Sequence, residues 1–215
     1  MNKTKIEWCD FTWNPVWGCR NNCPYCYARR LAHRFGESFE PHWKEKNFNR
    51  AMPKEPSRIF VNSMSDIAFW HDAWIERVFE RIKQNPQHTF LLLTKEPICY
   101  QGLHLIAPEN CWFGVTITQQ GMMNYFADLI FETTWDETKK IFFSIEPILE
   151  PIQLYVRPDW LIIGAETGNR AGKIVPEKSW IEELAWMGFR ENIPIFMKDS
   201  LKPIWGEDLG REWPR

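Results

Sequence analysis

The chain has 215 residues and a formal net charge of −2, with 44% hydrophobic and 25% charged residues. This composition excludes a wholly disordered chain, and the near-neutral charge argues against a protein that coats nucleic acid by electrostatics alone. Its apolar runs are far shorter than the roughly 20 residues that cross a bilayer, and no signal-like apolar segment follows the first lysines, so we expect a cytoplasmic protein without a membrane span.

Short apolar runs alternate with longer amphipathic stretches along the chain. Part of residues 11–18 is expected to be a strand. Six later runs lack strict alternation, which is typical of strands buried on both faces; they cover residues 58–62, 89–93, 112–116, 141–145, 160–164 and 193–197. Helices are expected over residues 27–35, from His71 or Asp72 to Asn85, over residues 119–130, and around Ile181 to Ala185.

The repeated strand–helix order predicts parallel pairing with right-handed crossovers. A (β/α) barrel and an open doubly wound sheet both fit that order. No G-x-G-x-x-G turn or P-loop follows any strand, which disfavours a nucleotide-binding open sheet. We therefore predict an α/β fold, a partial TIM-like (β/α) barrel with about six or seven parallel strands, in a single domain over residues 1–215.

The sharpest chemical signal is the C-x3-C-x2-C spacing of Cys19, Cys23 and Cys26. Three thiolates on one tight loop can bind a [4Fe–4S] cluster and leave one iron free for another molecule. A structural zinc site would need a fourth ligand, for which Cys9 or His33 is available. The polar residues Arg20, Asn21 and Asn22 are placed to donate hydrogen bonds to a cluster.

The cysteine loop, with the aromatic Tyr25 before its third cysteine, resembles the radical S-adenosylmethionine (SAM) superfamily. A longer set of short matches resembles the phage Gp37/Gp68-like family of unknown function, whose members are similar to radical SAM proteins. The matches are at residues 6–8, 12–15, 18–19, 26–28, 59–66, 86–90, 93–95, 144–147 and 163–168. The stretch from Phe196 to Ser200 departs from that family's pattern.

This resemblance implies a radical SAM enzyme of unknown reaction. Cys19, Cys23 and Cys26 would hold a [4Fe–4S] cluster, and SAM would chelate its open iron. Reductive cleavage of SAM would yield a 5′-deoxyadenosyl radical that takes a hydrogen atom from the substrate. An electron donor is then a required partner, whereas a nucleotide or nucleic-acid substrate follows from the phage association alone.

Polar residues end nearly every predicted strand, and parallel α/β folds bind ligands at the carboxyl ends of strands. From the positions that superfamily members use for SAM, we assign Asn62 and Ser63 to its amino group, Thr94 and Lys95 to its ribose or carboxylate, Ser144 and Glu146 to the ribose or substrate side, and Glu166 to the adenine side. Asp66 and Lys198 are further candidates for substrate contact. Lys95 could instead form an ion pair with Glu146 or Glu166.

Two other functions fit the same residues. A zinc-stabilised nucleic-acid-binding module would use Cys9 with the cysteine loop, the nearby arginines and some of the 13 tryptophans. The second alternative is a protein that keeps the cluster but lacks the radical reaction. The bound metal distinguishes the zinc module from both iron–sulfur hypotheses.

Overall fold

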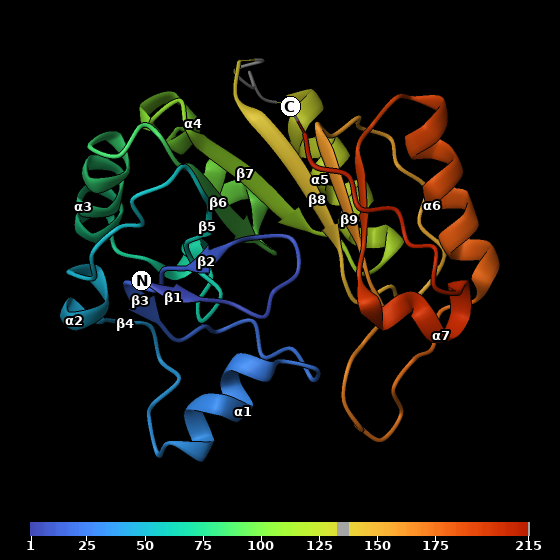
Figure 1. The fold of residues 1–215 in the computed structure, drawn as a ribbon, viewed down its shortest axis with the longest axis horizontal. Coiled ribbons are helices and arrows are strands. Elements are labelled where there is room, and N and C mark those ends of the chain that lie inside the picture. The colour runs from blue at the N-terminus through green and yellow to red at the C-terminus, as the bar shows by residue number, and fades with distance from the viewer. Residues whose placement is uncertain (133–137, 215) are drawn as a thin grey trace. The chain divides into compact units, whose positions relative to one another are not determined.

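The computed structural model describes residues 1–132 and 138–214, and Figure 1 shows its helices and strands. The chain divides into two compact units, Met1–Phe113 and Gly114–Arg215, with the boundary inside strand β7. Each unit is described by itself below. The single domain over residues 1–215 stays a prediction.

The first unit combines parallel strands with the cysteine loop. Strand β1 pairs antiparallel with β2, which pairs in parallel with β5, and β5 pairs in parallel with β6; β3 and β4 form a separate antiparallel ladder. The elements are β1 (Asn2–Lys3), β2 (Phe11–Thr12), β3 (Val16–Trp17), α1 (Tyr27–Arg34), β4 (His42–Trp43), α2 (Glu45–Phe48), β5 (Arg58–Phe60), a 3-10 turn (Ile67–Phe69), α3 (Asp72–Lys83), β6 (Thr89–Thr94), a second 3-10 turn (Pro97–Tyr100), α4 (Leu103–Ile106) and the start of β7 (Cys111–Thr116).

The second unit contains the strands β8, β9 and β10, which pair in parallel in that order. Its elements are α5 (Gln120–Glu132), β8 (Lys140–Ile145), β9 (Trp160–Ile163), α6 (Lys178–Arg190), β10 (Ile195–Met197), a 3-10 turn (Asp199–Leu201) and α7 (Lys202–Trp205). Among residues 1–132 and 138–214, no helix has the length and apolar character needed to cross a membrane.

The strand order of the main sheet is β1-β2-β5-β6-β7-β8-β9-β10. From β5 onward this order follows the chain, without the reversal that defines a doubly wound sheet. Within this sheet the strands after the antiparallel β1 form a parallel sheet with helical connections, which is the arrangement of a (β/α) barrel that is left open. The predicted fold class, a partial TIM-like barrel, is confirmed.

The hydrophobic pattern explains why these elements form. Strand β9 is buried along its whole length, and β8 is buried after its first residue, as expected for strands covered on both faces. Helix α3 buries Ile75, Val78, Phe79 and Ile82, the predicted i, i+3, i+4, i+7 face. It begins after His71 and ends before Pro86, which lacks the N–H that a helix needs.

One local prediction differs in detail from the structure. Within residues 11–18 the chain forms two short strands, β2 and β3, in different sheets. Pro15 lies between them and cannot donate to a ladder, which explains the interruption.

Gly114 tests how tightly β7 and β8 pack in the second unit. A Cβ at Gly114 would lie 2.2 Å from Cζ of Phe142, a fully buried ring that cannot move aside easily. We expect Gly114→Ala to lower the free energy of unfolding by about 1–3 kcal/mol through overpacking. Urea unfolding measures the change. The matched control is Gly121→Ala in α5, where a Cβ meets no atom within 4 Å; equal stability of the two variants would contradict this packing.

Candidate functional site

The cysteine loop begins at a glycine that no other residue can replace without strain. Gly18 has a φ of +97°, and a Cβ there would lie 2.2 Å from the carbonyl oxygen of Glu40. Its N–H donates to the carbonyl of Met64 at 3.0 Å, and the N–H of Cys19 donates to the carbonyl of Phe39 at 2.9 Å. These bonds fix the first cysteine against two distant segments of the chain.

The loop ends at the start of α1, where Cys26 occupies the N-cap position. The sulfur of Cys26 accepts the N–H of Arg29 at 3.4 Å, as an N-cap side chain does. The sulfur of Cys19 accepts the N–H of Asn21, also at 3.4 Å. Two of the three sulfurs therefore receive backbone hydrogen bonds, and at Cys19 this bond acts to lower the pKa of the thiol.

Apolar side chains pack beneath the loop. Cys19 and Cys26 contact a cluster that is made of Ala28, Ala32, Phe39 and Met64, together with Trp17 and Leu31. Burial raises the pKa of Cys19 to about 12, and it also raises the pKa of Cys23. The charge of Lys95 acts in the opposite direction on the pKa of Cys23. The Nζ of Lys95 lies 5.4 Å from the centre of the Tyr25 ring.

The three thiols are close enough for their charges to interact, since Cys23 and Cys26 both raise the pKa of Cys19. In the part of the chain that the structure describes, no group of three or more His, Cys, Asp or Glu side chains is already arranged around a metal position. Cys9 is buried and donates to the carbonyl of Ile6 at 3.9 Å, while His33 is exposed on α1. Neither forms a preassembled fourth zinc ligand.

The donor set fits an iron–sulfur cluster on the chemistry of these residues. It offers three thiols, backbone N–H bonds to sulfur, and two buried N–H groups for which the described residues provide no acceptor, Trp17 Nε1 and Arg29 Nε. Trp17 packs against the same apolar cluster as Cys19 and Cys26, and Arg29 donates from Nη2 to the carbonyl of Cys19 at 3.4 Å. Inorganic sulfides and thiolates accept such hydrogen bonds.

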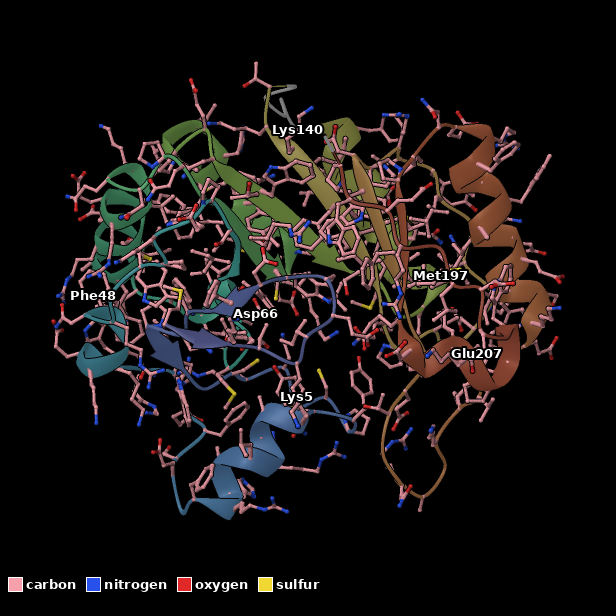
Figure 2. All side chains as sticks on the ribbon, viewed as in Figure 1. Lys5, Phe48, Asp66, Lys140, Met197 and Glu207 are labelled. Atoms are coloured by element: carbon pink, nitrogen blue, oxygen red, sulfur yellow. The ribbon has the colours of Figure 1, made fainter. Side chains whose placement is uncertain are left out.

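Asp66 joins this loop to the carboxyl end of β6. Its carboxylate accepts the side-chain amide of Asn21 at 2.7 Å and the backbone N–H of Lys95 at 3.0 Å. It also accepts the Thr94 hydroxyl at 2.6 Å and the N–H of Ala68 at 3.1 Å. Asp66 is a candidate for substrate contact from the sequence; in the structure it is buried, and both of its carboxylate oxygens accept hydrogen bonds from the protein. Figure 2 labels its position.

The residues assigned to SAM in the first unit also interact with groups of the same chain. The amide of Asn62 donates to the carbonyl of Leu93 at 2.6 Å and accepts its N–H at 3.0 Å, so it joins the ends of β5 and β6. The hydroxyl of Ser63 exchanges two hydrogen bonds with Asn14, at 3.0 and 3.1 Å. Lys95 is partly buried, and its charge acts on Cys23.

In the second unit the polar residues at strand ends form ion pairs. Glu146, after β8, pairs with Lys198, after β10. Glu166, after β9, is buried and accepts two bonds from Arg170, both at 2.7 Å. Both carboxylates are therefore paired with cations other than Lys95. Ser144 is buried within β8.

Three contributions to the loop are not identified by the sequence analysis: Arg29, Asn14 and the anchoring role of Asp66. The Cys26 to Arg29 spacing is a signal that could have located the N-cap bond, because a helix N-cap bonds to the third residue on. Among the predicted cluster donors, Asn21 contributes its backbone N–H, whereas Arg20 pairs with Glu40 at 3.0 Å in an exposed position. Asn22 is exposed with a φ of +51°.

A model of the family described as "Protein of unknown function (DUF5131)" matches residues 3–208. This description does not confirm the name Gp37/Gp68-like. A comparison with curated proteins finds no match.

Comparison with solved structures finds similarity to spore photoproduct lyase. One mutant of that protein has a TM-score of 0.50 and 15% sequence identity, with 76% of this chain and 57% of that chain covered. A second mutant has a TM-score of 0.51 and 13% identity, with 95% of this chain and 76% of that chain covered. The chain thus spans little more than half the length of the first of these two lyase chains. At these identities the similarity supports the fold.

Gly18 gives a direct test of how the loop is anchored. We expect Gly18→Ala to lower the free energy of unfolding by about 3 kcal/mol or more, because the methyl group adds a backbone clash to the strain of a positive φ. Thermal or urea unfolding measures this loss. Gly36→Ala is the control, since Gly36 has a φ of +65° but open space around its Cβ position. A loss no greater than that of Gly36→Ala would show that Glu40 does not restrict the loop.

Proposed function

The chain belongs to the DUF5131 family, whose description assigns no function, and we propose that this member is a radical SAM enzyme. In this proposal Cys19, Cys23 and Cys26 hold a [4Fe–4S] cluster, and SAM is the second cofactor. One observation carries the proposal: a three-thiol loop is bonded through Asn21 and Asp66 to Lys95, directly after the carboxyl end of β6. Parallel α/β folds bind their ligands at such ends.

The fold supports this assignment independently of the cysteines. The solved structures that resemble the chain are of spore photoproduct lyase, a radical SAM enzyme, and the shared architecture is a partial barrel. When bound, the cluster held by the three cysteines and SAM would supply reductive cleavage of SAM and abstraction of a hydrogen atom from the substrate, with an external reductant as the source of the electron.

The residues around the loop would bind and orient the cofactors. The N–H groups of Asn21 and Arg29 stabilise charge on two of the sulfurs. Lys95 places a positive charge near Cys23, where it can also attract the carboxylate of SAM. The apolar cluster under Cys19 and Cys26 excludes water from that side of the loop.

The proposed SAM contacts remain Asn62, Ser63, Thr94, Lys95, Ser144, Glu146 and Glu166. In the first unit, Lys95 is the strongest of these, because its charged group has no carboxylate among the ion pairs of that unit's described residues. Asn62, Ser63 and Thr94 would act by holding strand ends as well as by contact. The substrate class, a nucleotide or nucleic acid, rests on family association alone, and an external electron donor completes the reaction.

Reconstitution tests the metal site. Wild-type protein incubated anaerobically with iron and sulfide is expected to become brown, with visible absorption from thiolate-to-iron charge transfer. Alanine variants of Cys19, Cys23 and Cys26 should each lose most of the bound iron and sulfide, because each removes one of three ligands. Iron and sulfide analysis with absorption spectroscopy measures the loss.

The control for the ligand variants is Cys99→Ala. This cysteine is also partly buried, but its thiol donates to Thr94 at 3.8 Å and it lies outside the loop. It should retain the wild-type iron content. A colourless wild-type protein that binds zinc, and loses it when Cys9 is replaced, would instead establish the zinc-stabilised binding module.

Cleavage of SAM tests the reaction. Dithionite-reduced, reconstituted protein is expected to release 5′-deoxyadenosine and methionine, which chromatography detects. Lys95→Ala should weaken SAM binding roughly tenfold, because a hydrogen bond or ion pair to a charged group is lost. The exposed Lys54→Ala is the control. A cluster-containing protein that binds SAM and never cleaves it would identify a relative that keeps the cluster without the reaction.

A further inference from the structure

Asp66 connects three segments of the first unit through one buried carboxylate. Its Oδ1 accepts the Ala68 N–H and the Thr94 hydroxyl, and its Oδ2 accepts the Lys95 N–H and the Asn21 amide. Only 5% of the residue is exposed to solvent. The thiol loop, the turn after β5 and the carboxyl end of β6 therefore meet at this side chain.

The hydrogen bonds favour an ionised carboxylate. The backbone N–H groups of Ala68 and Lys95 can only donate, and the Asn21 amide directs its NH2 group toward Asp66. Thr94 accepts the N–H of Glu96 at 3.0 Å and donates its own hydroxyl proton to Asp66. Burial is the largest influence and raises the pKa of Asp66, while the bonds from Thr94, Lys95 and Ala68 act in the opposite direction. The four donors therefore stabilise the negative charge of this buried carboxylate.

The charge of Asp66 lies close to the thiol loop. Its carboxylate is bonded to the side-chain amide of Asn21, and the backbone N–H of Asn21 donates to the sulfur of Cys19 at 3.4 Å. A negative charge in a medium of low dielectric disfavours the addition of an electron to a nearby group. The positive charge of Lys95, whose backbone is bonded to Asp66, opposes this effect.

We propose that Asp66 is a positioning residue with two effects: it fixes the thiol loop against the end of β6, and its buried negative charge lowers the reduction potential of the cluster bound there. This inference rests on the proposed function, because it concerns the cluster that the three cysteines hold. A lower potential makes the reduced cluster a stronger electron donor. Asp66 acts through Asn21 and through its charge, and it touches none of the three sulfurs among the described bonds.

The experiment is a redox titration of the reconstituted full chain, followed by electron paramagnetic resonance without SAM. Asp66→Asn keeps the shape of the side chain and removes its charge, so the potential should shift to less negative values while the iron remains. Asn21→Ala keeps the charge and removes the link to the loop, so iron should pass to a chelator several-fold faster. Asp72→Asn, at an exposed acidic residue of α3, is the control for both readouts.

Each outcome separates the inference from the proposed function. A wild-type chain that takes up no cluster overturns the proposed function. A wild-type chain with a cluster whose potential and iron release are unchanged by Asp66→Asn and Asn21→Ala overturns the role of Asp66 alone. If Asp66→Asn fails to fold, Asn21→Ala decides: an unchanged rate of iron release from this variant overturns the inference.

Discussion

The partial burial of the thiols of Cys19 and Cys23 is the constraint on which the candidate site depends. Packing against Ala28, Ala32 and Phe39 makes ionisation of Cys19 costly, which raises its pKa to about 12. Metal ligation requires the thiolate, so binding of the proposed cluster would release protons and would bring positive charge to the loop. Lys95 and the N–H groups of Asn21 and Arg29 provide part of that stabilisation.

The fold holds that loop by contacts that are far apart in the sequence. Gly18 is bonded to Met64, Cys19 to Phe39, and Asn21 to Asp66, so the loop is attached to the segment after β5 on one side and to the chain before β4 on the other. Because Asp66 is also bonded to Lys95, the loop and the end of β6 share one anchor. The same carboxylate therefore fixes geometry and sets the local field.

In the second unit the carboxylates that follow the strands are already paired with cations. Glu166 is buried, and a ligand that used its carboxylate would have to displace Arg170 from two 2.7 Å bonds. Removing one partner from a buried pair is costly because the remaining charge is left without compensation. Glu146 and Lys198 are less buried, so a ligand can reach their pair at a smaller cost. Of the three second-unit residues assigned to SAM, Glu146 is therefore the one best placed to exchange its partner for a ligand.

The sequence could predict whatever depends on local periodicity or spacing. Neighbouring residues alone are enough to predict the buried strands β8 and β9, the apolar face of α3 and the loop with three spaced cysteines. The partners of polar side chains could not be predicted in the same way, because they depend on long-range contacts: Asn21 and Asp66 are 45 residues apart, and Asn14 and Ser63 are 49 apart. Polar residues at strand ends therefore led to a predicted site, but they did not show that Asn62, Ser63 and Asp66 hold the strand ends and the loop together. Structure is needed there because a carboxylate that binds a ligand and one that anchors a loop have the same sequence signature.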